Sequence, residues 1–409
     1  MRLLYGFGIR VLYSLMWIAS FFNPKAKKWI LGRKDLLKPE SIPSGKEIYW
    51  FHCASLGEFD QGLPVMNAFK EQNPELFLVV TFFSPSGIEF YNKRDHKVDL
   101  AVYLPIDTKR KAEKFIEVLR PSKVFFVKYE FWYNHLKAAR RSGAKVYGVS
   151  SLFRPTHRFF KWYGGFFRKA LHLFDFFYVQ DQRSADLLKS IGIQQVEVTG
   201  DTRYDRMLAV KEKQSSNAII EQFVKTEDVL LLGSSWPIDE ETFLTALQEA
   251  SKKMKMIIAP HDISEAHVES ICNLFKDDAV RYTRFNDSSK RVLILDTIGQ
   301  LTSTYKYATV AYVGGGFTGK LHNILEPGAF GVPVLIGPKF ERFPEAQLFT
   351  ERGVASVVNN TQEFLIALEN SLINKMSIGA ELSAIFRENA GAARKIVKAV
   401  NAETQSNGH

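Results

Sequence analysis

The sequence predicts an α/β protein with two doubly wound domains that face a central cleft, together with an amino-terminal membrane-associated helix. Apolar runs of strand length alternate with helical segments in two series along the 409 residues. A polar stretch without strand character separates the two series, and the segment from Leu3 to Phe22 is almost wholly apolar. Alternating strands and helices are typical of parallel sheets covered on both faces, and this length suffices for two domains.

Residues 1–35 are predicted to form a helix that lies in or dips into a membrane, followed by a basic flank. Arg10 interrupts the apolar run, and a charge at the bilayer centre costs about 2.5–3.5 kcal/mol on insertion scales. We therefore favour an interfacial position over a span; a helix packed on the first domain is the alternative. A basic flank keeps the rest of the chain on the cytoplasmic side; it consists of Lys25, Lys27, Lys28, Arg33 and Lys34.

The first strand–helix series fills residues 36–205, which we expect to form the amino-terminal domain. Its predicted strands are Glu47–Phe51, Phe77–Phe83, Val102–Pro105, Lys123–Val127, Lys145–Ser150, Phe176–Gln180 and Val196–Thr199. Residues 206–226 are predicted to be the linker.

The second series fills residues 227–384, and residues 385–409 are predicted to form a carboxy-terminal helix, with Ile385–Val400 helical, and a polar tail. The predicted strands of the second series are Val229–Leu232, Met256–Ala259, Arg291–Leu295, Thr309–Val313, Val332–Ile336 and Ala355–Val358. Ligands of doubly wound sheets lie at the carboxyl ends of the strands, which here means in the cleft.

The composition indicates an anionic partner and gives no sign of a metal site. The formal net charge is +10, which favours nucleic acid, a membrane surface or a phosphorylated substrate. The two cysteines, Cys53 and Cys272, provide neither a disulfide framework nor zinc-ligand spacing. No acidic pair with metal-ligand spacing is present either, so we expect basic side chains and a helix dipole to stabilise a leaving phosphate.

The stretch from Val310 to Gly337 predicts a strand, a glycine-rich loop, a short helix and a second strand. Gly314, Gly315 and Gly316 let the backbone turn and approach a ligand closely. Unpaired N–H groups at the helix start favour an anion, and Glu326 in its first turn can accept hydrogen bonds from ribose hydroxyls. An ordinary crossover whose glycines only make turns remains the alternative.

Polar residues follow several other predicted strands. In the first domain Glu58, Glu130 and Arg203 come at three strand ends, and Lys128 lies two residues before Glu130. A carboxylate such as Glu58 can act as general base on an attacking hydroxyl. Taken alone, Glu58 is better explained by a position in the first turn of a helix, where it interacts with the helix dipole, but three charged residues at three strand ends outweigh any one of them. In the second domain the loops that gather around a nucleotide-sized place contain Gly233-Ser234-Ser235, Pro260-His261-Asp262 and Asp296 to Leu301.

The segment Leu152 to Phe177 mixes basic residues with many aromatic ones. Such interleaving occurs in proteins that bind single-stranded nucleic acid and in surfaces that bind phosphorylated lipids. Because an apolar anchor is also present, we favour the lipid and expect no nucleic-acid partner. The residues predicted to form this acceptor or membrane surface are Arg154, Arg158, Lys161 and Arg168.

The motifs taken together resemble the lipid A Kdo transferases, in which Kdo is 3-deoxy-D-manno-octulosonic acid. The matching stretches span nearly the whole chain in order and include HCASLGE, TFFSPSG, KYEFW, TGDTRYD, DTIGQL, AYVGGG and HNILEPGAFGVPVLIGP. The resemblance implies the GT-B fold of two Rossmann-like domains. It also implies a metal-independent, inverting transfer of Kdo, without a cofactor, from the donor CMP-Kdo to the tetraacyl disaccharide bisphosphate that precedes lipid A. The expected location is the cytoplasmic side of the inner membrane.

Carried over residue by residue, the resemblance implies that Glu58 is the proton acceptor and Arg203 a stabiliser of the transition state. We count Lys128 and Glu130 with this catalytic group, although the family has an acid where Lys128 stands. The donor contacts implied by the match are Pro260, His261, Ile298, Gly299, Gln300, Asn323, Ile324, Leu325 and Glu326, to which the glycine-rich and serine loops add Gly315, Gly316, Ser234 and Ser235. His261 replaces a family arginine, and Gln300 replaces a family glutamate.

Two other functions fit parts of the pattern. Another GT-B nucleotide-sugar transferase, or an epimerase that uses a uridine nucleotide, would share the nucleotide site but explain the anchor less well. A basic membrane-associated binding protein would use the same surface without chemistry. For that protein, Glu58→Gln would leave the function intact.

Overall fold

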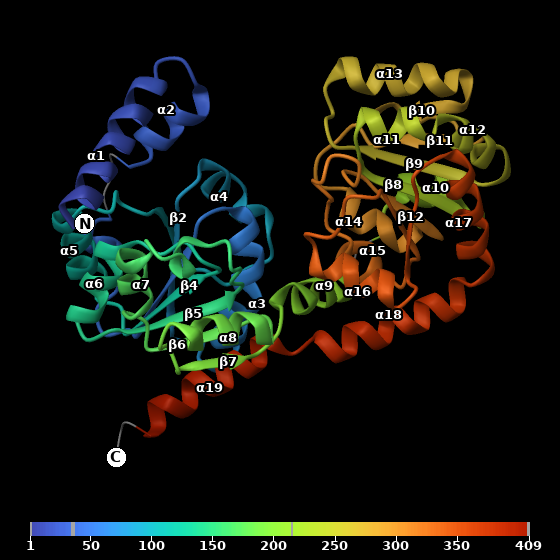
Figure 1. Ribbon diagram of the computed structural model, residues 1–409. Coiled ribbons are helices and arrows are strands. Elements are labelled where there is room, and N and C mark those ends of the chain that lie inside the picture. Colours follow the sequence, from blue (N-terminus) through green and yellow to red (C-terminus); the bar gives the residue numbers. More distant parts are fainter. Residues whose placement is uncertain (1, 34–36, 214–215, 407–409) are drawn as a thin grey trace. The chain divides into compact units, whose positions relative to one another are not determined.

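The structure is a computed structural model that describes residues 2–33, 37–213 and 216–406 (Figure 1). Among these residues the chain divides into two compact units. The first takes the chain up to Arg206 and again from Asn389, and the second runs from Met207 to Glu388. Lys34 of the predicted basic flank and residues 214–215 of the predicted linker lie outside the described ranges.

The described part of the first unit contains a seven-stranded sheet in which all paired strands are parallel, in the order β3-β2-β1-β4-β5-β6-β7. Its strands are β1 Ile48–Cys53, β2 Phe77–Phe82, β3 Leu100–Tyr103, β4 Lys123–Val127, β5 Lys145–Ser151, β6 Phe176–Val179 and β7 Val196–Val198. Each predicted strand of the first series is present, with ends shifted by at most two residues.

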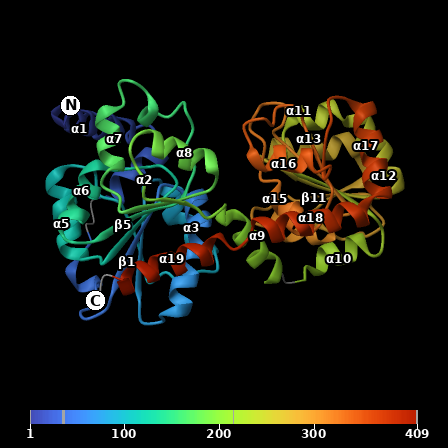
Figure 2. The ribbon, with the colours of Figure 1, turned by 60° about the horizontal axis from the view of Figure 1, so that its bottom comes forward.

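Helices cover both faces of this first sheet. The α-helices of the unit are α1 Arg2–Ala19, α2 Pro24–Leu31, α3 Leu56–Gln72, α4 Pro85–Phe90, α5 Lys109–Leu119, α6 Tyr133–Arg141, α7 Gly165–Leu171, α8 Gln182–Ser190 and α19 Ala392–Ser406, while α9 Thr202–Glu212 contains the boundary between the units. Helices α3 and α19 cover one face, and α5 and α6 cover the other (Figure 2). Because side chains of a strand alternate between faces, Phe51 packs with α3 and α19, whereas Trp50 packs with α5 and α6.

The amino-terminal helix packs on the first unit through one face only. Ile9 of α1 lies in an apolar cluster with Trp29 and Ile30 of α2. Tyr5 donates a hydrogen bond to Asp107, and the buried guanidinium of Arg33 donates to three backbone carbonyls, including that of Leu104 at 2.9 Å. Burial lowers the pKa of Arg33 to about 9. Among the described residues, no helix is both long and apolar enough to cross a bilayer.

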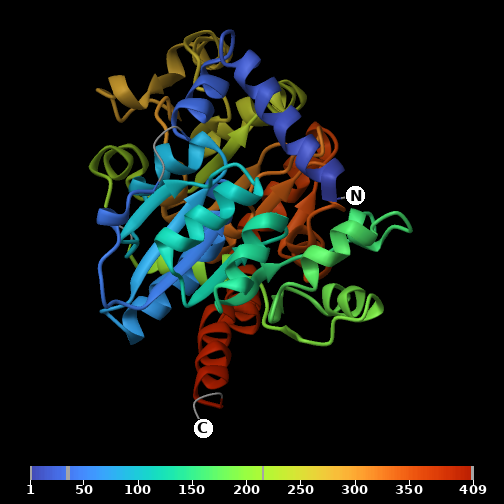
Figure 3. The same cartoon turned by 90° about the vertical axis from the view of Figure 1, so that its left-hand side faces the viewer.

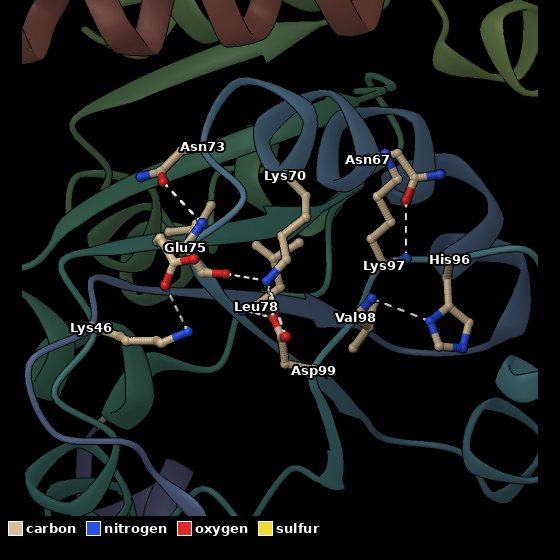
Figure 4. Close-up of polar contacts among 11 residues, drawn as sticks. Lys46, Asn67, Lys70, Asn73, Glu75, Leu78, His96, Lys97, Val98 and Asp99 are labelled. Carbon is tan, nitrogen blue, oxygen red and sulfur yellow. Dashed lines mark hydrogen bonds and ion pairs between the residues drawn. The ribbon is translucent and has the colours of Figure 1, made fainter.

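Asp99 holds the beginnings of the strands β2 and β3 together, as Figure 4 shows. Its carboxylate accepts the Leu78 N–H at 2.8 Å and the Lys70 ammonium at 2.8 and 3.0 Å. Nearby, His96 Nδ1 accepts the Val98 N–H at 3.2 Å. These contacts lie at the amino edge of the sheet, opposite to the edge where a doubly wound sheet carries its site.

The described part of the second unit contains a second seven-stranded parallel sheet, in the order β10-β11-β9-β8-β12-β13-β14. Its strands are β8 Val229–Ser235, β9 Lys255–Pro260, β10 Ala279–Arg281, β11 Val292–Ile294, β12 Val310–Val313, β13 Val334–Ile336 and β14 Ala355–Val357. The sequence predicted all of these except β10, a three-residue strand at the edge.

The helices of the second unit also form two layers (Figure 2). One apolar cluster joins the sheet to α12, α13 and α17, and another joins its opposite face to α10. The helices are α10 Ala218–Val224, α11 Pro237–Thr242, α12 Leu244–Lys253, α13 Glu265–Phe275, α14 Leu301–Thr304, α15 Leu325–Ala329, α16 Pro344–Glu351, α17 Thr361–Ile373 and α18 Lys375–Asn389.

The carboxy-terminal segment is divided between two helices, where the sequence predicted one from Ile385 to Val400. The break follows α18 at Gly391, whose φ of 95° is in the left-handed region that glycine adopts freely. The Gly391 N–H donates to Asp205 at 2.9 Å, and α19 then packs on the first sheet through Ile396 and Val400.

Candidate functional site

Glu58 lies where the chain leaves the buried strand β1 and enters α3. The strand ends at Cys53, Ser55 is the N-cap, and Glu58 occupies the first helical turn. The Ser55 hydroxyl donates to Glu58 Oε2. The side chain is 17% exposed. A carboxylate in this place is held by the helix start and is still accessible to a substrate hydroxyl.

Lys128 brings a positive charge to Glu58 from the neighbouring strand. It follows β4, which pairs with β1, and its Nζ lies 3.7 Å from Glu58 Oε1. The backbone of Lys128 is left-handed with φ 66°, and its N–H donates to Val149 at 3.0 Å. The carboxyl edge of the sheet therefore joins two of the charged residues that the sequence placed at strand ends.

Glu130 adds a second carboxyl group to this cluster. Its Oε2 is buried and has no hydrogen-bond partner among the described residues. Burial, and then the negative charge of Glu58, raise the pKa of Glu130 to about 7. A carboxyl group whose pKa is raised by burial and by the charge of Glu58 can accept and hold a proton more readily than an exposed one.

Arg203 stands at the start of α9 and has a described partner of its own. Its Nη2 and Nε lie 2.7 and 2.8 Å from Asp201 Oδ2, and its N–H donates to Asp201 Oδ1 at 2.9 Å. Both partners of this pair lie in the motif TGDTRYD, two residues apart, so the pair could have been predicted from the sequence. The guanidinium is thus held in a fixed orientation by Asp201.

In the second unit, residues at the end of β8 and just after it form hydrogen bonds with other side chains of the same unit. Ser235 is fully buried and its hydroxyl donates to Glu240 at 2.7 Å, so this hydroxyl is already engaged. Ser234 has a left-handed backbone with φ 54°. Asp239 accepts hydrogen bonds from the Tyr312 hydroxyl at 2.6 Å and from the N–H groups of Trp236 and Gly315 at 2.9 and 3.1 Å.

Close packing of the backbone requires glycine at positions 314 and 316 of the loop after β12. A Cβ at Gly314 would lie 2.2 Å from Ser234 O, and one at Gly316 would lie 2.5 Å from Gly337 N. Gly315 has φ 91° and its N–H is taken by Asp239. The glycines therefore have a structural reason in addition to any approach of a ligand.

Glu326 and Asn323 lie together at the start of α15, and Glu326 also contacts α14, the helix that follows the loop after β11. Glu326 Oε2 accepts from the Thr302 hydroxyl at 2.8 Å, and Oε1 accepts from Asn323 Nδ2 at 3.2 Å. In the same loop Ile298 is exposed and Gly299 has φ 96°. The structure thus links Glu326 to the helix that follows another predicted donor loop.

Gln300 and the residues at the start of α15 turn toward the protein. The Gln300 amide oxygen accepts from Asn217 at 3.3 Å, while Ile324 and Leu325 are fully buried. The Leu325 N–H donates to Asn323 Oδ1 at 3.3 Å, so these residues support the loops.

An aromatic cluster that the sequence did not predict surrounds His261. The Trp236 and His261 rings stack with centroids 4.3 Å apart and an angle of 15°, and the His322 centroid lies 4.7 Å from that of His261. Trp236 Nε1–H donates to His322 Nε2 at 3.3 Å. Pro260, just before His261, is buried at the end of β9. The positions of Trp236 and His322, one at each of two strand-end loops, were the available signal.

The basic-aromatic segment lies beside the amino end of α1 (Figure 3), where the Phe166 and Tyr5 rings are 5.2 Å apart. Trp162 is 91% exposed, and Arg154 and Arg158 are exposed as well. Lys161 is half-buried, and its backbone carbonyl, like that of Phe159, accepts from Arg168 at 3.4 Å. Arg168 therefore shapes this segment from within.

The acidic, histidine and cysteine side chains do not gather into a metal centre in the part of the chain that the structure describes. Within those ranges, no group of three or more His, Cys, Asp or Glu side chains is arranged to hold a metal ion.

A family model and several curated proteins that resemble this chain carry the same description. Residues 30–206 match the family model described as 3-Deoxy-D-manno-octulosonic-acid transferase (kdotransferase). The 3-deoxy-D-manno-octulosonic acid transferase of Chlamydophila psittaci is 27% identical over 81% of this chain and 77% of its own length. The protein of the same name from Aquifex aeolicus is 25% identical over 85% of this chain and 92% of its own.

Solved structures establish the fold. UDP-GlcNAc 2-epimerase from Neisseria meningitidis aligns with a TM-score of 0.64 at 16% identity, covering 87% of this chain and all of that one. A glycosyltransferase from Rickettsia africae aligns with a TM-score of 0.56 at 11% identity, covering 87% of this chain and 97% of that one. At such identities the likeness concerns the fold alone, which is the predicted GT-B arrangement of two parallel-sheet domains.

Proposed function

We propose that this chain, which matches the Kdo transferase family model over residues 30–206 and resembles named Kdo transferases over most of its length, transfers Kdo from CMP-Kdo to the tetraacyl disaccharide bisphosphate precursor of lipid A, in lipopolysaccharide core biosynthesis. The observation that carries the proposal is the placement of Glu58. In a chain similar to named Kdo transferases over most of its length, an accessible carboxylate stands at the carboxyl end of a buried strand, in the family's SLGE motif.

The chemistry is a single displacement. A hydroxyl of the acceptor attacks the anomeric carbon of Kdo while the bond from that carbon to the phosphate oxygen breaks. The hydroxyl proton goes to Glu58, and the bonding electrons leave with CMP. One base and one displacement invert the anomeric centre. A positioned base of this kind contributes roughly 10²–10⁴-fold in rate.

Lys128 and Glu130 adjust this base. The Lys128 ammonium lies 3.7 Å from Glu58 Oε1 and brings a positive charge to the proposed base. Glu130, whose pKa is about 7, is placed to hold a proton beside Glu58 after the transfer. Arg203, oriented by Asp201, supplies positive charge for the leaving phosphate without a metal or another cofactor.

Donor recognition is assigned to the second unit. Glu326 and Asn323 form a polar pair in which carboxylate oxygens can accept from ribose hydroxyls. The exposed loop from Ile298 to Gln300 adjoins them through Thr302. The backbone at the start of α15 and the side chain of His261 are the proposed phosphate contacts.

We assign membrane contact to the outer face of α1 and to the basic-aromatic segment beside it. The face of α1 turned away from the protein exposes large apolar side chains, among them Leu4, Phe7, Leu15 and Ile18. Exposed apolar groups next to arginines suit the surface of an anionic bilayer. The proposed acceptor, a phosphorylated lipid, would then be within reach on the cytoplasmic side of the inner membrane.

The direct experiment combines purified protein, CMP-Kdo and the tetraacylated precursor, and reads the product by mass. An increase of one or more Kdo residues supports the function. A folded protein that gives no product with CMP-Kdo, but turns over a uridine nucleotide sugar, would move the chain to the alternative GT-B activity.

A further inference from the structure

Trp132 connects the two amino-terminal helices to the loop that carries Glu130. It is the N-cap residue of α6 and comes two residues after Glu130. Its ring stacks on that of Phe83, with centroids 4.8 Å apart and an interplanar angle of 23°, and the Phe83 ring lies 5.5 Å from that of Trp29 in α2. Both Trp132 and Phe83 pack against the apolar cluster that contains Ile9 of α1. One side of Trp132 therefore rests on α1 and α2, which we call the amino-terminal helix pair.

A buried histidine holds the indole N–H of Trp132. His52 of β1 is 1% exposed, and its Nε2 accepts from Trp132 Nε1–H at 3.0 Å. Because Nε2 accepts, the proton of the neutral ring is on Nδ1, which donates to Thr81 Oγ1 at 3.0 Å. Burial, and then the charge of His135, lower the pKa of His52 to about 3. Trp132 is therefore anchored to β1 by a hydrogen bond that does not change with pH in the neutral range.

Asp107 joins α1 to the start of α6. Its buried carboxylate accepts from the Tyr5 hydroxyl of α1, from the N–H groups of Asn134 and His135 at 3.1 and 2.9 Å, and from His135 Nδ1 at 2.6 Å. Although burial acts to raise the pKa of Asp107, the hydrogen bonds from His135 and Tyr5 hold this pKa below its usual value. A carboxylate at a helix start is stabilised by the unpaired N–H groups there. Asp107 thus fixes α1 and the first turn of α6 to one another.

The loop from Lys128 to Trp132 is held at its two ends and carries Glu130 between them. At its start the Lys128 N–H donates to the Val149 carbonyl at 3.0 Å, and at its end stand Trp132 and the first turn of α6. Glu130 Oε2 is buried and has no hydrogen-bond partner among the described residues. The place of this carboxyl group therefore depends on the anchors of the loop.

We propose that Trp132 and Asp107 are positioning residues for the transfer reaction: resting on the amino-terminal helix pair, they hold Glu130 beside Glu58. The inference rests on the proposed function, and it gives α1 an effect on turnover in addition to its proposed contact with the membrane. A displacement of about 1 Å at a reacting group can cost about 10²-fold in rate, so a loosened loop lowers kcat. Donor binding, which is assigned to the second unit, does not depend on this loop.

Kinetics with CMP-Kdo and the lipid precursor in detergent micelles test the positioning role, because vesicle binding does not enter there. Trp132→Phe keeps a ring that can stack on Phe83 but removes the donor to His52. Its kcat should fall about tenfold while KM for both substrates is unchanged. In a Glu130→Gln background, which still has Glu58 as base, the same substitution should change kcat by about twofold at most, because it acts through Glu130.

Three further variants test the anchors one by one. His52→Gln supplies an amide oxygen that can accept from Trp132, so its kcat should stay within about twofold of the parent. His52→Leu has no acceptor and should resemble Trp132→Phe. Tyr5→Phe loses the hydrogen bond from α1 to Asp107 and should lower kcat about threefold in micelles, where membrane contact plays no part.

Tyr178→Phe is the matched control for the loss of one buried hydrogen bond. The Tyr178 hydroxyl of β6 donates to Glu403 of α19 at 3.2 Å, in the same unit. This variant should lose about as much stability as Tyr5→Phe and keep the kcat of the parent.

Parent-like kcat in Trp132→Phe or in Tyr5→Phe would overturn the positioning role, and so would an undiminished effect of Trp132→Phe in the Glu130→Gln background. An equal fall of kcat in Tyr178→Phe would also overturn it, since the losses would then follow stability alone. A folded parent that makes no product from CMP-Kdo would instead contradict the proposed function itself.

Discussion

Lys128 Nζ lies 3.7 Å from Glu58 Oε1, so the proposed general base faces a cation supplied by the adjacent strand. The distance exceeds that of a hydrogen bond, and the pair is partly exposed. Its contribution to folding stability is therefore small, and its effect should appear in the rate of transfer.

Replacing Lys128 by Gln should slow transfer, because it removes the cation that lies 3.7 Å from Glu58 Oε1. A fall in kcat/KM of about tenfold is expected, which corresponds to ~1.4 kcal/mol in the barrier. Lys128→Arg should retain the parent rate. Equal kcat/KM for the parent and Lys128→Gln would show that the ion pair has no influence on the base.

Glu130 should make the protein less stable as pH rises. Its folded pKa of about 7 lies above that of an unfolded glutamate, about 4.3, so the folded state binds more protons between these values. Stability is then highest below pH about 4.3 as far as this group is concerned, and falls up to about 7, by on the order of 1–3 kcal/mol.

The measurement is the Tm of Glu130→Gln relative to the parent across that window. The difference should change in favour of the variant as pH rises from about 5 to about 8. A difference that stays constant with pH would mean that Glu130 is ionised throughout.

Glu326→Ala should weaken protection by CMP. Ligand binding to the folded state raises Tm, and loss of the carboxylate removes the proposed ribose contact and the bonds to Thr302 and Asn323. Thermal unfolding with and without CMP measures this, with Glu249→Ala on the exposed face of α12 as control. Stronger protection of the parent by UDP than by CMP would favour the uridine-nucleotide alternative.

Charges on the outer face of α1 should release the protein from lipid vesicles without unfolding it. Phe7 and Leu15 are 64% and 59% exposed, so Phe7→Glu with Leu15→Glu costs little in the folded state. Co-sedimentation with anionic vesicles should fall while Tm is retained. Tyr5→Phe loses the hydrogen bond to Asp107, so it should lower the stability of the fold by about 1 kcal/mol while co-sedimentation with vesicles is retained. Unchanged co-sedimentation of the charged variant would exclude this face.

The sequence was sufficient to predict a site residue where that residue directly follows a recognisable strand. Glu58, Lys128 and Glu130 each follow a predicted strand, and parallel strands bring their carboxyl ends to one edge. The contact between Trp236 and His322 could not be predicted, because it depends on β12 pairing with β8 rather than with a strand nearer in sequence. The break at Gly391 was missed because the surrounding residues favour helix throughout.

The central claim is that Glu58 takes the proton of the attacking hydroxyl. Glu58→Gln keeps the size of the side chain and its hydrogen bonding with Ser55 while removing the base. With saturating CMP-Kdo and lipid acceptor, turnover should fall by roughly 10²–10⁴-fold while CMP still protects the protein from unfolding. Equal turnover in Glu58→Gln and the parent would contradict the account and leave Glu58 with a role at the start of α3 alone.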